Sequence, residues 1–187
     1  LSLIRGAGVD VGLVHGGGPA INAELERRGL TWKFSDGLRV TTPEMMEVIE
    51  MVLCGKVNRR IVRTLNQSSV RAIGLSGSDA RTLFCKPMRD DLGLVGEVTD
   101  VRPAAIEAIL RTQDEGIGTI PVIAPIGIGE NGQAYNINAD WAAVRIAEAL
   151  DIDKVLFLTD QEGILGSDGK LVGELDAGEL EVLIEEG

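Results

Sequence analysis

The fold is decided by the stretch VGLVHGGGPA at residues 11–20. A short apolar run typical of a buried strand breaks into three consecutive glycines, and Pro19 then opens a helical pattern. Proline suits the first helical turn because its missing N–H would have no partner there. Three glycines allow a sharp turn and leave the backbone N–H groups uncovered. A strand, a glycine turn and a helix N-terminus in this order either bind an anion or simply let strand and helix pack closely.

Length and composition set the broad class of the protein. The 187 residues, 44% of them hydrophobic, are enough for one sizeable domain or two small lobes. The net charge of −11 argues against a surface for nucleic acid or anionic membrane, and no apolar run is long enough to span a bilayer. Cys54 and Cys85 lie in apolar settings, which favours unpaired buried thiols in a reducing compartment. We therefore expect a cytoplasmic protein that binds neither nucleic acid nor membrane.

Strand-like runs alternate with helical patterns, which predicts an α/β fold with a largely parallel sheet. The expected strands are 11–14, 71–75, 83–86, 93–98, 120–124 and 155–158, and the expected helices are 19–28, 43–66, 103–111, 139–150 and one that begins at a capping box formed by Asp176 and Glu179. The longest helix starts at a capping Thr42, and its apolar stripe, which includes Met45 and Ile49, is typical of a core or a subunit contact.

Polar residues follow several of these strands, at the edge where open α/β sheets bind ligands. They occur at 16–18, 76–79, 136–140 and 159–163. Arg39 follows an Asp36-Gly37 turn and would either clamp a carboxylate with two N–H groups or pair with Asp36 on the surface. Asn138 is expected to cap the helix that follows it, with Asp140 in the first turn.

Other common sites are excluded by their missing residues. The chain has neither a G-x-x-x-x-G-K-[ST] phosphate loop nor the G-x-G-x-x-G spacing of a dinucleotide site. A single histidine, His15, cannot form a Cys/His zinc cluster, and it fits a satisfied, partly buried residue better than a catalyst. Lys56 and Asn58 on the long helix are expected to face solvent or a partner subunit.

Six stretches, taken together, resemble the N-acetylglutamate kinases, a branch of the amino-acid kinase family. They are VHGGGP at 14–19, DGLRVT at 36–41, MEVIEMVL at 46–53 with GKVN at 55–58, GLVGEV at 93–98, YNINAD at 135–140 and LTDQEGIL at 158–165. They follow the family's order and cover nearly the whole chain. The glycine triplet is shared with other amino-acid kinases, whereas Gly-Leu-Arg-Val and Asn-x-Asn-Ala-Asp are more specific to this branch.

The resemblance implies a three-layer α/β/α sandwich with a mainly parallel central sheet, truncated at both ends. Lobe 1–125 would bind N-acetyl-L-glutamate and make the dimer contact, and 126–187 would begin an ATP-binding lobe on one continuous sheet. The implied reaction is phosphorylation of the side-chain carboxylate of N-acetyl-L-glutamate by ATP, the second step of arginine biosynthesis. The implied assembly is a homodimer or a hexamer built from three dimers.

The resemblance also assigns roles to individual residues. Arg39 would bind the substrate's α-carboxylate, and Asn136 would help to hold its amino-acid portion. The N–H groups of Gly17 and Gly18 would contact the substrate and the moving phosphoryl group, and Asp140 would orient the catalytic lysines. The nucleotide, which would carry the Mg²⁺ so that no protein metal site is implied, would lie along Thr159, Asp160, Gly163, Ile164 and Leu165.

The sequence departs from the family pattern in one respect. The family's Lys-x-Gly-Gly strand and its later lysine segment have no counterpart among these residues, so we expect the chain as given to catalyse poorly. Two other functions stay open: a related kinase that acts on a carrier-protein-bound aminoadipyl or glutamyl group, and a non-catalytic amino-acid-sensing domain of the same fold. Gly18 and Arg39 favour free N-acetylglutamate over the carrier-bound substrate.

Overall fold

The computed structural model describes residues 4, 7–68, 70–114, 117–159, 163–166 and 170–186. The chain divides into two compact units, Leu1–Val155 and Leu156–Gly187. The strand–glycine–helix stretch lies in the first unit, which contains every described strand that pairs into a sheet.

A parallel sheet forms the centre of the first unit. It consists of β1 (Leu13–Val14), β9 (Ile120–Ala124) and β4 (Ala72–Ser76), with β9 in the middle and parallel to both neighbours. All five residues of β9 are buried, which explains why its sequence is continuously apolar instead of alternating. Three of the strands predicted from the sequence therefore exist, within one or two residues of the expected bounds.

The first unit also contains a second, mixed sheet. Its order is β11 (Ala134–Asn136), β10 (Ile126–Ile128), β5 (Leu83–Pro87) and β6 (Gly96–Val101). Only β10 and β5 are parallel in this sheet, and the other two pairs are antiparallel. Where one continuous sheet was expected, the described strands pair in separate sheets. Pro125 lies between β9 and β10 and has no N–H to donate, so the hydrogen-bond ladder is interrupted there.

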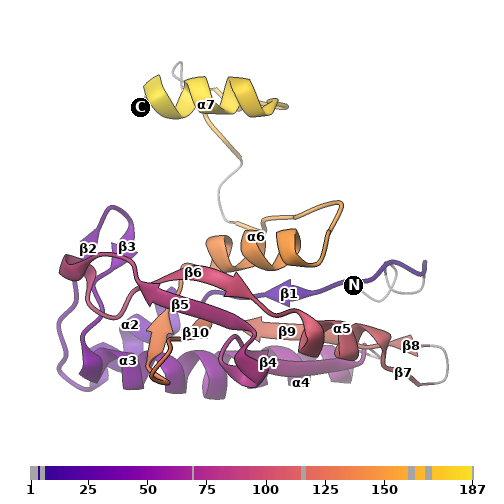
Figure 1. Cartoon of the computed structure of the whole chain (residues 1–187), viewed down its shortest axis with the longest axis horizontal. Helices are drawn as coiled ribbons and strands as arrows, with labels where there is room; N and C mark the ends of the chain where they lie inside the picture. Colours follow the sequence, from indigo (N-terminus) through magenta and orange to yellow (C-terminus); the bar gives the residue numbers. More distant parts are fainter. Residues whose placement is uncertain are drawn as a thin grey trace. The chain divides into compact units, whose positions relative to one another are not determined.

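Helices cover both faces of the parallel sheet (Figure 1). One face carries α2 (Gly18–Arg27) and a continuous helical stretch of α3 (Pro43–Glu50), the π-helical η1 (Met51–Asn58) and α4 (Arg59–Gln67). The other face carries α5 (Ala104–Arg111) and α6 (Ala139–Ala149). Val122 of β9 packs with the α4 side and its neighbour Ile123 with the α5 and α6 side. The expected α/β/α sandwich with a mainly parallel central sheet is confirmed.

The long helical stretch begins as predicted, because the Thr42 hydroxyl accepts a hydrogen bond from the Met45 N–H at 3.3 Å. Its apolar stripe, from Met45 to Val57, is buried within the same chain and belongs to the core. Shorter elements complete the unit: β2 (Phe34–Ser35), β3 (Leu38–Arg39), η2 (Asp79–Arg81), η3 (Asp90–Leu92), β7 (Gln113–Asp114) and β8 (Ile117–Gly118).

The strand predicted at 155–158 is wrong. These residues form no strand, and Leu156 and Leu158 are 76% and 89% exposed. An apolar run becomes a strand only when a neighbour takes its backbone N–H and C=O groups, and among the described residues no strand pairs with it. The second unit does contain the expected last helix, α7 (Ala177–Glu186). Asp176 and Glu179 exchange the two side chain–backbone hydrogen bonds of a capping box at 2.9 Å each.

In the part of the chain that the structure describes, no helix is both long and apolar enough to cross a bilayer.

Candidate functional site

A cavity of about 180 Å³, which we call the glycine cavity, opens where three segments of the first unit meet. The glycine turn at 16–18 forms one wall, and the β2–β3 hairpin with Arg39 forms another. Asn136, at the end of β11, lies in the wall next to the start of α6. The structure thus brings together Gly17, Gly18, Arg39 and Asn136, four of the residues selected from the sequence.

The glycine turn presents bare backbone to this cavity. A Cβ on Gly17 would lie 2.6 Å from Cδ2 of Leu53, a buried side chain of η1, whereas a Cβ on Gly18 would meet no atom within 4 Å. The first turn of α2 leaves the N–H groups of Gly18 and Ala20 without partners inside the helix. No acidic residue lies in that turn, so the positive end of the helix dipole is not neutralised locally.

Arg39 brings a buried positive charge to the opposite wall. Its guanidinium carbon lies 4.8 Å from the ring centre of Phe34 and 5.7 Å from that of Trp32. One terminal nitrogen, Nη2, donates to Oδ1 of Asn22, and the other, Nη1, is buried with no hydrogen-bond partner in the described structure. Burial lowers the pKa of Arg39, but an arginine side chain stays charged in proteins. A fixed cation with an unused donor is suited to bind a carboxylate.

The surface pairing of Arg39 with Asp36, one of the two readings of the sequence, is wrong. Asp36 accepts instead from Arg89, at 2.8 Å. The aromatic neighbours of Arg39 were not selected from the sequence, although a signal existed. Only 3% of the chain is aromatic, yet Trp32 and Phe34 stand within seven residues of the arginine.

Thr41, a residue not selected as part of the site, links Arg39 to Asn136. Its side chain is completely buried. The hydroxyl donates to the carbonyl of Arg39 at 2.8 Å and accepts from Nδ2 of Asn136 at 3.2 Å. The Asn136 N–H in turn donates to the carbonyl of Leu94 at 2.9 Å. Both polar walls of the cavity therefore share one hydrogen-bonded support.

His15 holds the glycine turn and is not placed to act as a catalyst. Its Nδ1 donates to the carbonyl of Gly16 at 2.9 Å, and its Nε2 accepts from Nδ2 of Asn58 at 3.2 Å. Burial lowers the pKa of His15, which keeps the ring neutral. The expectation of a satisfied histidine is confirmed. The expectation that Asn58 faces solvent or a partner is wrong, because this side chain is completely buried and also donates to the carbonyl of Val122 at 2.9 Å.

The remaining selected residues lie elsewhere. Asp140 is exposed in the first turn of α6, and Asn138 caps this helix as expected, accepting from the N–H groups of Asp140 and Trp141. The residues expected along a nucleotide that the structure describes are Thr159, Gly163, Ile164 and Leu165, which belong to the second unit. Asp160 falls outside the described residues.

A larger cavity of about 390 Å³ lies between β6 and α6. Trp141 and Val144 make part of its wall, and its arginine, Arg145, donates to Glu148 at 2.7 Å. Because Arg145 is exposed and already paired with a carboxylate, this cavity is less suited to bind an anion than the glycine cavity.

A parallel α/β sheet that ends in a bare glycine turn opposite a buried arginine places this chain among the α/β proteins with a site suited to a small anion. The chain belongs to the amino acid kinase family, whose sequence profile matches residues 1–187. The resemblance to this family is thereby confirmed.

Curated relatives and a solved structure are similar to this chain. The acetylglutamate kinase of Geobacter sp. strain M21 is 42% identical over 99% of this chain and 66% of its own length. The acetylglutamate kinase of Dinoroseobacter shibae is 45% identical over 99% of this chain and 63% of its own length. The crystal structure of smu.665 from Streptococcus mutans UA159 has a TM-score of 0.89 at 29% identity, covering 99% of this chain and 74% of that one. The chain thus spans just under two thirds of the length of these curated relatives.

Proposed function

We propose that the protein to which this chain belongs is a cytoplasmic acetylglutamate kinase: it phosphorylates the side-chain carboxylate of N-acetyl-L-glutamate with ATP, as a step of arginine biosynthesis. The similarity to acetylglutamate kinases supports this proposal. The observation that carries it is the buried Nη1 of Arg39, which lies in the wall of the glycine cavity and has no hydrogen-bond partner among the described residues.

The cavity offers complementary groups to the α-carboxylate and to the amide N–H of this substrate. Arg39 would bind the α-carboxylate through Nη1, because Asn22 already holds Nη2 and fixes the plane of the guanidinium. Asn136 uses its Nδ2 on Thr41, which orients its carbonyl Oδ1 as an acceptor for the amide N–H of the acetylated amine. This arrangement would distinguish an acetylated amino acid from a free one, whose ammonium group would lie near the arginine.

Phosphoryl transfer to a carboxylate needs positive potential more than proton transfer. The side-chain carboxylate is ionised at neutral pH, so one of its oxygens can bond to the γ-phosphorus while the bond to the ADP oxygen breaks, with no proton to remove. The N–H groups at Gly17 and Gly18 would stabilise the charge on the transferring group. The neutral His15, engaged on both ring nitrogens, has no part in this step.

The rest of the proposal concerns the nucleotide and the assembly. ATP would lie along Thr159, Asp160, Gly163, Ile164 and Leu165, and Asp140 would orient the catalytic lysines. Mg²⁺ would arrive with the nucleotide and neutralise phosphate charge. Lobes 1–125 and 126–187 would form the two halves of the kinase, and two or six copies would assemble, which light scattering can measure.

Calorimetry tests the proposal directly. The chain is titrated with N-acetyl-L-glutamate, N-acetyl-L-aspartate and L-glutamate, and the titrations are repeated on Arg39→Ala and on Arg111→Ala, a control that removes an exposed arginine of α5. We expect selective binding of N-acetyl-L-glutamate, weakened about ten-fold or more by Arg39→Ala, as for a lost hydrogen bond to a charged group. The control should bind like the original chain. Preferential binding of an unacetylated amino acid would instead favour a sensing domain, and equal binding by Arg39→Ala would remove this residue from the site.

A further inference from the structure

The hairpin that carries Arg39 is too small to hold its own position. β2 and β3 contribute two residues each and form a two-stranded sheet separate from the two larger sheets. Its turn is tight, with Asp36 and Gly37 both at positive φ (50° and 75°), the arrangement that Asp-Gly favours. An isolated hairpin of this length is marginally stable in water. The wall of the cavity therefore depends on contacts from elsewhere in the chain.

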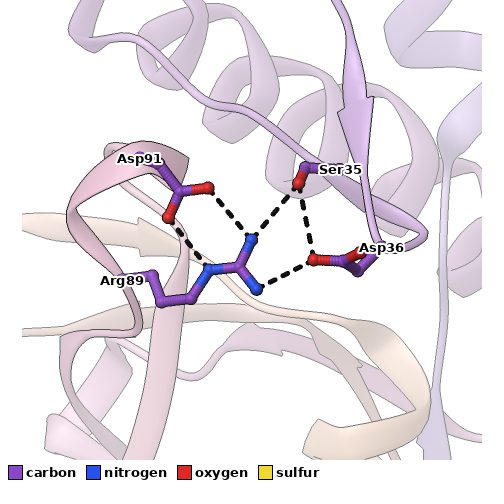
Figure 2. Close-up of polar contacts among 4 residues, drawn as sticks. All are labelled: Ser35, Asp36, Arg89 and Asp91. Carbon is purple, nitrogen blue, oxygen red and sulfur yellow. Dashed lines mark hydrogen bonds and ion pairs between the residues drawn. The ribbon is translucent and has the colours of Figure 1, made fainter.

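Arg89 supplies such a contact at the tip of the hairpin (Figure 2). Its Nε and Nη2 donate to the two carboxylate oxygens of Asp91 at 2.9 and 3.0 Å, and its Nη1 donates to Oδ2 of Asp36 at 2.8 Å. The Ser35 hydroxyl accepts from Nη2 at 3.2 Å. The fork to Asp91 orients the guanidinium, and the remaining N–H groups are then aimed at the hairpin. We call these four residues the Arg89 clamp.

The segment that carries Arg89 also supports the base of the same hairpin. Thr41, which follows β3, donates its N–H to the carbonyl of Leu92 at 3.0 Å and accepts from the N–H of Leu94 at 2.8 Å. A Cβ on Gly93 would lie 2.3 Å from the Thr41 carbonyl oxygen, so the two backbones are in close contact. The segment at 89–94 therefore contacts both ends of the hairpin: its base through backbone hydrogen bonds and its tip through the clamp.

We propose that Arg89 is a positioning residue for the glycine cavity. By holding the tip of the β2–β3 hairpin, it sets the place from which Arg39 reaches the ligand. Arg89 does not itself line the cavity. The choice of N-acetyl-L-glutamate as the ligand rests on the proposed function. Hydrogen bonds from Arg89 lower the pKa of Asp91, and the hydrogen bonds to Asp91 and Asp36 raise the pKa of Arg89, so the fork between Arg89 and Asp91 joins two charged groups. Exposed ion pairs are weak singly, and a forked arginine that joins two carboxylates is the arrangement in which they count.

Three variants test this role: Arg89→Gln, Arg89→Lys and the control Arg111→Gln. Arg111 is also an exposed arginine that donates to a carboxylate, Glu107 at 2.8 Å, so its loss changes the net charge equally. The affinity for N-acetyl-L-glutamate is measured by calorimetry. Hydrogen exchange of the Val40 amide, which donates to the Lys33 carbonyl beside the hairpin at 3.1 Å, is measured without ligand.

We expect Arg89→Gln to weaken binding about three- to five-fold, the range of a well-formed surface ion pair, and to speed exchange at Val40. For Arg89→Lys, the affinity and the exchange rate should lie between those of the original chain and Arg89→Gln, because an ammonium group cannot make the fork to Asp91 and reach Asp36 together. Arg111→Gln should change neither quantity. An intermediate Arg89→Lys would show that geometry matters in addition to charge.

Each alternative result has a distinct meaning. Unchanged exchange at Val40 in Arg89→Gln overturns the inference, even if binding weakens, because the effect would then be one of charge alone. Faster exchange with unchanged affinity also overturns it, since the hairpin's position would not matter to the ligand. If the original chain is folded and binds no N-acetyl-L-glutamate, the proposed function fails, and the inference about binding fails with it. Faster exchange in Arg89→Gln would still identify the clamp as the hairpin's support.

Discussion

Two adjacent glycines shape the cavity for different physical reasons. Gly17 has no room for a side chain because Leu53 lies against it, whereas Gly18 faces open space. We expect Gly17→Ala to lower the free energy of unfolding by about 1–3 kcal/mol, the usual cost of overpacking a filled core. Gly18→Ala should leave it unchanged or raise it by about 0.5 kcal/mol, because alanine restricts the unfolded chain. Urea denaturation of both variants makes the comparison, and equal losses would contradict it.

His15 should make the stability of the chain depend on pH below neutrality. Its pKa in the folded state is lowered from the ordinary value of 6.5, so the unfolded chain binds more protons between the two values. Stability should therefore rise with pH through the window just below 6.5 and be lost as the pH falls through it. His15 is the single histidine of the sequence, which makes the effect assignable. In urea titrations at pH 7.5 and 5.5, His15→Gln should lack this part of the change, and an identical pH dependence would refute the assignment.

For single residues, the sequence predicts which side chains belong to the site better than it predicts how deeply a side chain is buried. Arg39 could be selected because it follows an Asp-Gly turn, and the glycine triplet could be selected from its position between a strand and a helix. Both line the cavity, on opposite walls. Asn58 could not be placed, because a polar residue on a long helix is usually exposed. Its burial depends on His15 and on a carbonyl of β9, two partners that are distant in the sequence.

Among the elements, the turn after β4 carries backbone strain that one substitution should relieve. Ala80 and Arg81 in η2 both have positive φ, 51° and 55°. A side chain costs roughly 1–2 kcal/mol in this region, and glycine does not have that cost. We expect Ala80→Gly to raise the free energy of unfolding by about 0.5–1 kcal/mol after the extra freedom of glycine in the unfolded chain is subtracted.

The matched control for this substitution has the opposite sign. Ala108 is an exposed residue inside α5, where glycine is disfavoured. Ala108→Gly should lower the free energy of unfolding by about 1 kcal/mol. Thermal unfolding of both variants measures the difference, and destabilisation by Ala80→Gly would show that the turn has no strain to release.

Elements with a clear period or a capping residue are predictable, and elements that depend on a distant neighbour are not. Thr42 and the Asp176–Glu179 box fix the starts of two helices by local hydrogen bonds. β9 is recognisable because burial on both faces makes it continuously apolar. The equally apolar residues 155–158 form no strand, since hydrophobicity cannot supply the paired backbone that a strand requires.

For the molecule as a whole, the connection between the two units should be the first site of proteolysis. Leu156, Phe157 and Leu158 are exposed and form neither helix nor strand, so their backbone can enter a protease. Brief digestion with chymotrypsin should cut between 156 and 158 and leave the first unit intact, as shown by mass spectrometry. Phe84 lies in β5 and is paired with both neighbouring strands, β10 and β6, so it serves as the internal control. Early cutting at Phe84 would show that the first unit is not compact.

The pairing of β1 with β9 has a consequence for synthesis of the protein. Leu13 is paired with Val122, more than a hundred residues later in the chain. On the ribosome, at about 5–20 residues per second, the strand before the glycine turn waits on the order of ten seconds for its neighbour. During that interval the backbone groups that will pair with β9 are open to pairing with other nascent chains. The rate at which the codons for residues 15–124 are translated therefore sets how long the β9-facing edge of β1 stays unpaired.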